Sequence, residues 1–180
     1  NPIAYCEGGF YGGNLKPSDK IKPLLKSATA SFGITALNEL QQLHNKKSLY
    51  EDGKFVIEVM EYINKKIDEF KNEDNVLYAI YGTPAESLCG LQVKQFRKKF
   101  GIIENVSDRE YVSNSFHAHV TENITPIQKQ DTEKRFWDLL NGGKIQYVKY
   151  PIEYNREAIK TLVKRAMDLG FYEGVNLSLS

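Results

Sequence analysis

Cysteine, methionine and tryptophan are scarce in this sequence of 180 residues, which has two cysteines, two methionines and one tryptophan. Two cysteines cannot form the set of several disulfides that stabilises small secreted domains. An excess of one charge is also missing, because 24 lysines and arginines are balanced by 23 aspartates and glutamates. A domain that neutralises many nucleic-acid phosphates would carry a strong basic excess, so we expect no nucleic-acid partner.

Long apolar runs are absent as well. No run approaches the roughly 18 to 20 apolar residues that cross a bilayer, and no basic-then-apolar stretch resembles a signal peptide. We therefore expect no membrane partner and a cytoplasmic location. Hydrophobic residues still make up 41% of the chain and aromatic residues 12%. This content is enough for a packed core and excludes disorder as a description of the whole chain.

The length suits one domain or one large piece of a bigger domain. Residues 175–179 resemble a strand with nothing after it, and the chain also opens abruptly. We expect residues 1–180 to be a single fragment of a larger domain.

Strands and helices are predicted to alternate from residue 75 onward. The helix before them, at residues 54–70, carries an apolar stripe that includes Val56, Met60 and Phe70. Strands are expected at residues 76–81, 111–120, 144–150 and 175–179, and helices at residues 84–100, 126–140 and 156–169. This alternation is typical of an α/β fold with parallel strands, in which ligands bind at the carboxyl ends of the strands.

The junction after the strand at residues 76–81 is the strongest candidate for a binding site. Thr83 suits the N-cap of the next helix, Pro84 suits its first position, and Glu86 completes a capping box. The free amides of such a helix start attract anions, and Thr83 and Ser87 add hydroxyl donors. Many well-capped helices bind nothing, however, and the Glu86 carboxylate would compete for the same donors. Thr125 and Asn155 are expected to cap the two later helices in a structural role.

The two histidines of the predicted strand at residues 111–120 raise the question of a metal site. His117 and His119 would point to the same face of a strand, but zinc needs more ligands than two. We expect no metal there, and we interpret the polar residues of this segment as the lining of a cavity. Cys6 and Cys89 match no nucleophile pattern and are interpreted as ordinary packed residues.

Five segments of the chain resemble the anaerobic ribonucleoside-triphosphate reductases, a family of glycyl-radical enzymes. They are residues 28–40 (ATASFGITALNEL), 78–87 (YAIYGTPAES), 111–117 (YVSNSFH), 141–148 (NGGKIQYV) and 173–179 (EGVNLSL). The resemblance implies the later part of a ten-stranded α/β barrel that reduces ribonucleoside triphosphates to their deoxy forms. It also implies a glycyl radical made by a radical-SAM activating enzyme, formate as reductant, zinc in a region outside this sequence, and a homodimer.

The resemblance favours phosphate binding at the first junction. By analogy with this family, we expect substrate contacts from Gly82, Thr83, Pro84, Ala85, Glu86, Ser87, Asn114, Ser115 and His117. No catalytic role carries over to Cys6 or Cys89, because neither lies in the family's thiyl-cysteine motif. The isolated chain is therefore expected to be inactive. The alternative is a non-catalytic α/β module that binds a phosphate-bearing ligand, and a structural or interaction protein comes third.

Overall fold

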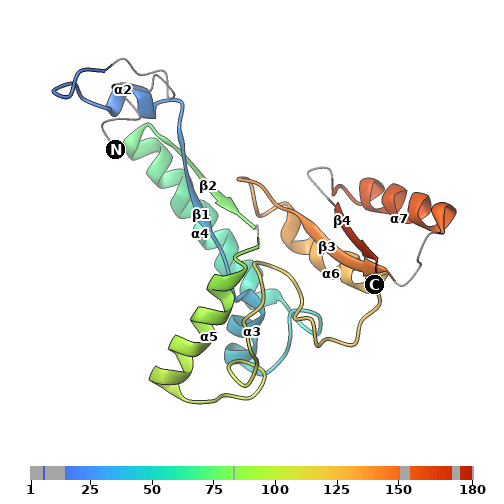
Figure 1. Ribbon diagram of the computed structural model, residues 1–180. Coiled ribbons are helices and arrows are strands. Elements are labelled where there is room, and N and C mark those ends of the chain that lie inside the picture. Colours follow the sequence, from blue (N-terminus) through green and yellow to red (C-terminus); the bar gives the residue numbers. More distant parts are fainter. Residues whose placement is uncertain (1–5, 7–14, 83, 151–154, 172–174, 180) are drawn as a thin grey trace.

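The computed structural model describes residue 6 and residues 15–82, 84–150, 155–171 and 175–179. Figure 1 shows helices and strands alternating along the chain. In chain order the elements are α2 (Lys22–Leu25), β1 (Thr29–Gly33), α3 (Leu37–Asn45), α4 (Lys54–Asp74), β2 (Leu77–Tyr81), α5 (Ser87–Phe100), α6 (Pro126–Trp137), β3 (Gln146–Tyr150), α7 (Arg156–Asp168) and β4 (Val175–Leu179). None of these helices is long and apolar enough to cross a membrane.

Both pairs of strands in the structure are parallel. β1 pairs with β2, with Thr29 opposite Leu77, and β3 pairs with β4, with Gln146 opposite Val175. Parallel strands separated by helices agree with the predicted α/β class. The four described strands cannot show a ten-stranded barrel, which stays a prediction.

A short contact connects the two strand pairs. Gly82, directly after β2, forms a parallel bridge with Lys144, shortly before β3. The Gly82 amide donates to the carbonyl oxygen of Gly143 over 2.9 Å. The Ile80 amide donates to the side-chain oxygen of Asn141, also over 2.9 Å. The turn after α6 is thereby fastened to the carboxyl end of β2.

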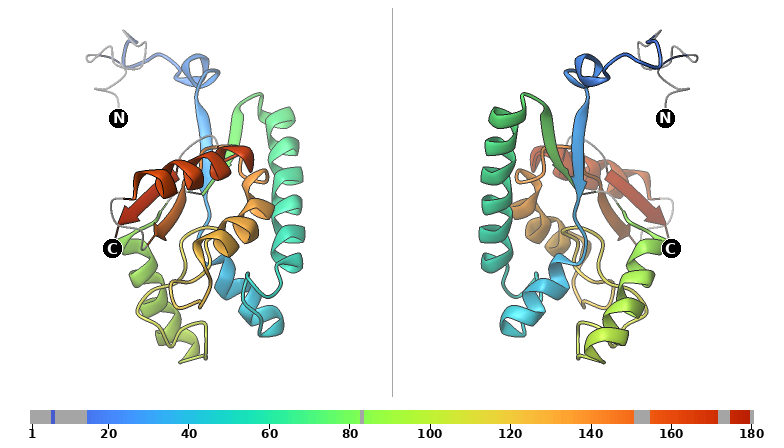
Figure 2. Two further views of the ribbon diagram at one scale, coloured as in Figure 1. Left: turned by 90° about the vertical axis from the view of Figure 1, so that its right-hand side faces the viewer. Right: turned by 90° about the vertical axis from the view of Figure 1, so that its left-hand side faces the viewer.

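The main core lies where α4 packs on the β1–β2 pair. Figure 2 shows α4 running beside this pair, next to β2. Val56, Met60 and Ile67 of its apolar stripe are buried together with Ile80 of β2, whereas Phe70 is 41% exposed. The predicted stripe is therefore correct except at its last member. Other elements complete the core with Leu37, Leu49, Phe116, Phe136, Trp137, Leu140, Ala166 and Phe171.

Two of the predicted helix caps are confirmed. Thr125 accepts a hydrogen bond from the Gln128 amide and forms a full capping box at the start of α6. Asn155 accepts from the Ala158 amide at the start of α7. α6 ends at Trp137, earlier than predicted.

The predicted strand at residues 111–120 is wrong. This segment is an irregular loop whose one ladder contact is an antiparallel bridge between Asn114 and Thr35. Ser115 has a φ of 46°, and the His117 amide turns back to donate to the Asn114 carbonyl oxygen over 2.9 Å. Asn and Ser favour such turns because their side chains compete with ladder hydrogen bonds. The segment is apolar because the loop is packed into the interior, where Phe116 is completely buried.

Candidate functional site

A pocket of about 480 Å³ lies beside this loop. Its walls include Pro84 after β2, Asn114 and His117 of the loop, Lys129 of α6 and Tyr147 of β3. Asn114 also pairs with Thr35, just after β1, so the pocket lies near the carboxyl ends of β1 and β2. In parallel α/β sheets this end is where ligands usually bind.

The turn into α5 differs from the predicted one. α5 begins at Ser87, and its N-cap is Glu86, with a φ of 44° and no side-chain capping bond. The prediction that the helix begins at Pro84 is therefore wrong, and Thr83 lies outside the described residues. The Ala85 amide, expected to face a phosphate, donates instead to the side-chain oxygen of Asn114 over 2.8 Å. A distant side chain thus replaces the local capping box.

Gly82 and Ser115 lie against each other. A Cβ atom on Gly82 would come within 2.6 Å of the Ser115 hydroxyl oxygen, and within 2.8 Å of Leu140 and Phe116 side-chain atoms. Gly82 therefore allows the loop to approach the end of β2 closely. Of the nine expected contact residues, Pro84, Asn114 and His117 line the pocket. The other described members of this set do not line it: Gly82, Ala85, Glu86, Ser87 and Ser115.

A buried carboxylate, Glu133, organises one wall of the pocket. Its side chain is completely buried, and one of its oxygens lies 3.1 Å from Nδ1 of His117. The same oxygen accepts from the ammonium group of Lys129, one turn earlier on α6. The other oxygen accepts from the side-chain amide of Gln146 over 3.2 Å. This cluster joins the loop, α6 and β3.

The electrostatics of the cluster keep Glu133 ionised. Burial alone would raise the pKa of Glu133, because it disfavours the charged form. The charges of His117 and Lys129 and their hydrogen bonds outweigh burial, and the pKa falls from 4.5 to about 2. An ionised carboxylate at neutral pH can only accept hydrogen bonds.

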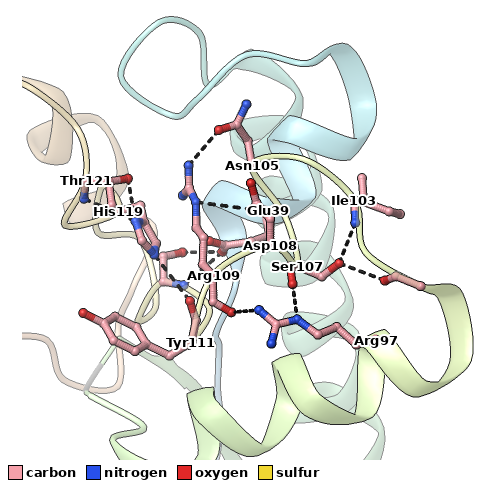
Figure 3. A network of polar contacts seen from close by, with 12 residues as sticks. Glu39, Arg97, Ile103, Asn105, Ser107, Asp108, Arg109, Tyr111, His119 and Thr121 are labelled. Carbon is pink, nitrogen blue, oxygen red and sulfur yellow. Dashed lines mark hydrogen bonds and ion pairs between the residues drawn. The ribbon is translucent and has the colours of Figure 1, made fainter.

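The second histidine of the loop serves a different network, shown in Figure 3. His119 lies 2.9 Å from the Thr121 hydroxyl through Nδ1 and 3.3 Å from the Tyr111 carbonyl oxygen through Nε2. Burial, followed by the charge of Arg109, lowers the pKa of His119. Arg97 extends from α5 to the carbonyl oxygen of Arg109, and this contact holds the loop from the other side. His119 is therefore part of the support of the loop.

Metal binding finds no support in the described part of the chain. His117 and His119 bind different partners, so the pair considered from the sequence does not form. No group of three histidine, cysteine, aspartate or glutamate residues there could hold a metal ion. Cys89 is buried and donates to the side-chain oxygen of Asn114, and burial raises the pKa of its thiol.

Sequence reasoning missed Lys129, Glu133, Gln146 and Glu39. The signal for Lys129 and Glu133 is their spacing of four residues on one helix, which also describes ordinary surface ion pairs. Glu39 of α3 is 3% exposed and accepts from both the amide and the hydroxyl of Ser113. These groups hold the loop and shape the pocket wall.

Comparisons with known proteins agree with one another. The family model described as anaerobic ribonucleoside-triphosphate reductase matches residues 1–177. The curated anaerobic ribonucleoside-triphosphate reductase of Haemophilus influenzae is 31% identical over 97% of this chain and 26% of its own length. The protein of the same name from enterobacteria phage T4 is 32% identical over 98% of this chain and 28% of its own length.

Solved structures show the same similarity in fold. An anaerobic ribonucleotide reductase superposes with a TM-score of 0.72 at 20% identity, covering 86% of this chain and 25% of that protein. The anaerobic ribonucleotide reductase of Thermotoga maritima, crystallised with dATP in its specificity site, gives 0.70 at 19% identity, with coverages of 84% and 26%. The chain spans about a quarter of the length of these relatives.

Proposed function

The chain belongs to the anaerobic ribonucleoside-triphosphate reductase family, and we propose that it forms the later part of the ten-stranded catalytic barrel of such an enzyme. In this proposal the whole enzyme reduces ribonucleoside triphosphates to deoxyribonucleoside triphosphates, and this segment binds the substrate. The proposed enzyme is a cytoplasmic homodimer, and a radical-SAM activating enzyme is its partner.

One observation carries the proposal for this segment. The pocket brings Pro84, Asn114 and His117 together near the carboxyl ends of two parallel strands. These three residues come from the two sequence segments expected to contact substrate. A site of this size and position suits a ligand of the size of a nucleotide.

The charges around the pocket are compatible with a phosphate group. The Lys129 ammonium lies in its wall with 19% of its side chain exposed. Glu122 also lines the pocket, and burial raises its pKa. Glu86 and Ser87 do not line the pocket, but their amides follow the lining residue Pro84 at the start of α5, where the helix dipole attracts negative charge.

The radical chemistry lies outside this segment in our proposal. Cys89 is buried and protonated, and it donates to Asn114. Within the described residues zinc would find no group of three suitable ligands. By analogy with the family, we assign the glycyl radical, the formate site and the zinc-binding region to other parts of the enzyme.

The test introduces a negative charge at the start of α5 in the intact reductase. Ser87→Asp should raise the KM for the ribonucleoside triphosphate by about tenfold, since one unit charge a few ångströms from a phosphate costs about 1–2 kcal/mol. The helix itself should tolerate the change, because acidic residues stabilise a helix N-terminus. Ser27→Asp, an exposed position before β1, is the matched control. An equal KM in the two variants would contradict phosphate binding at this turn.

A further inference from the structure

One polar atom at the pocket has no partner. Six buried side-chain nitrogen and oxygen atoms of the described residues make no hydrogen bond. Of these, Nε2 of His117 is the one whose residue lines the pocket. The His117 side chain is 8% exposed. A buried polar atom without a protein partner is costly, and a hydrogen bond from a group bound beside this pocket wall would remove that cost.

The partners of Glu133 determine which nitrogen of His117 carries the proton. Glu133 is ionised and accepts only, so Nδ1 of His117, 3.1 Å away, must be the donor. The Lys129 ammonium also lies 3.5 Å from Nδ1, but its nearer acceptor is the Glu133 oxygen, which leaves Nδ1 to donate to the same carboxylate. A neutral His117 therefore has its proton on Nδ1 and an unshared electron pair on Nε2.

His119 shows the opposite arrangement. Its Nε2 faces the carbonyl oxygen of Tyr111, which can only accept, so Nε2 is the donor. Its Nδ1 accepts from the Thr121 amide over 3.3 Å. Both ring nitrogens of His119 are thus satisfied by the protein. The unsatisfied nitrogen of His117 is a specific feature of the pocket.

The surroundings of His117 hold its ring and balance the charge of Glu133. The ring packs edge-on against Tyr147 at 5.6 Å and against Phe116 at 4.4 Å between centroids. Lys129 pairs with the same Glu133 oxygen that Nδ1 of His117 faces. A neutral Nε2 accepts a hydrogen bond from a hydroxyl group, whereas an ionised phosphate has no proton to donate.

We propose that Nε2 of His117 accepts a hydrogen bond from a ribose hydroxyl of the bound nucleotide, and that Glu133 is the positioning residue that fixes this tautomer. The inference rests on the proposed function, since it takes the ligand to be a ribonucleoside triphosphate. It changes the expected role of His117 from phosphate contact to sugar contact. The phosphates would then lie nearer Pro84 and the first turn of α5.

The tautomer is measured directly in the unmodified chain. The chain has three histidines, so selective ¹⁵N-histidine labelling and long-range ¹H–¹⁵N spectra at neutral pH resolve each ring. Single His44→Gln and His119→Gln variants assign the signals. We expect a protonated Nδ1 and an unprotonated Nε2 for His117, and the reverse for His119. A proton on Nε2 of His117 at neutral pH, in a neutral or a doubly protonated ring, would overturn the proposal.

Binding to the intact reductase tests the ligand group. The probes are a substrate ribonucleoside triphosphate and inorganic tripolyphosphate, which lacks the sugar. His117→Phe keeps an aromatic ring but removes the acceptor, and it should weaken binding of the nucleotide by about tenfold, as expected for one hydrogen bond. Tripolyphosphate binding should stay unchanged. His117→Gln, whose side-chain oxygen can accept at a similar reach, should recover part of the loss.

The outcomes separate this inference from the proposed function. An equal loss for both probes would show that His117 contacts phosphate, which overturns the inference and leaves the proposed function standing. No loss for either probe would remove His117 from the site. Failure of Ser87→Asp to raise the KM would count against phosphate binding itself, whatever the histidine does.

Discussion

Glu133→Gln removes a completely buried carboxylate that accepts hydrogen bonds from three side chains. Glutamine has nearly the same shape, so the substitution changes charge with little change in packing. The pKa of Glu133 falls from 4.5 to about 2 in the folded protein, because the charges of His117 and Lys129 outweigh burial. At about 1.4 kcal/mol for each pKa unit, the ionised form contributes about 3 kcal/mol to folding.

The sign of the pH dependence follows from the direction of the shift. The folded protein binds the Glu133 proton less tightly than the unfolded chain does, so protonation favours unfolding. The contribution is fully present above about pH 4.5 and is lost as the pH falls toward about 2. Between about pH 6 and pH 3, the free energy of unfolding of the wild type should fall by about 2 kcal/mol more than that of Glu133→Gln.

Urea unfolding at several pH values measures this difference. The free energy of unfolding is obtained for wild type, for Glu133→Gln and for Glu104→Gln, in which an exposed carboxylate is changed instead. The difference in free energy of unfolding between wild type and Glu133→Gln should become smaller in acid. The difference between wild type and Glu104→Gln should stay constant. A constant difference between wild type and Glu133→Gln would refute the conclusion that this cluster holds the carboxylate ionised.

Three further predictions concern packing, capping and reactivity. Gly82→Ala should destabilise the chain by about 1–3 kcal/mol, because its Cβ would lie 2.6 Å from another side chain. Gly90 lies within α5, and a Cβ atom there would come no closer than 3.8 Å to another residue, so Gly90→Ala should stabilise the chain by up to about 1 kcal/mol. Urea midpoints equal to that of the wild type would contradict both glycine predictions. Thr125→Ala should cost about 1 kcal/mol in the same assay through loss of the cap of α6, and unchanged stability would argue against the capping box. Cys89 should react with iodoacetamide far more slowly than Cys6, because it is buried and burial raises its thiol pKa, and equal labelling rates by mass spectrometry would exclude this.

Local signals in the sequence predicted the elements that local forces form. The capping box of Thr125 needs only residues three positions apart, and it is present. The stripe of α4 is correct at Val56 and Met60 because helical spacing alone decides which side faces the sheet. Strand 76–81 was predicted to within one residue of β2.

Contacts between distant residues decided the remaining features. The Ala85 amide bonds to Asn114, 29 residues away, so the capping pattern around Thr83 and Glu86 did not predict the helix start. Glu133 contacts His117 across 16 residues, and its spacing from Lys129 looks like that of any surface ion pair. The sequence predicted Asn114 and His117 as site residues, but the carboxylate that orients His117 could be found only in three dimensions.

The buried loop between α5 and α6 also affects how the length of the chain can vary. Connecting segments usually accept insertions and deletions, because they run over the surface and carry few contacts. Here Val112, Phe116 and Ala118 are packed like core residues, and Ser113 is bonded to Glu39. One added residue would displace His117 from Glu133 and Asn114 from the turn into α5. Length differences among relatives should therefore fall near Gly101, where a side chain would meet open space, and should avoid residues 112–119.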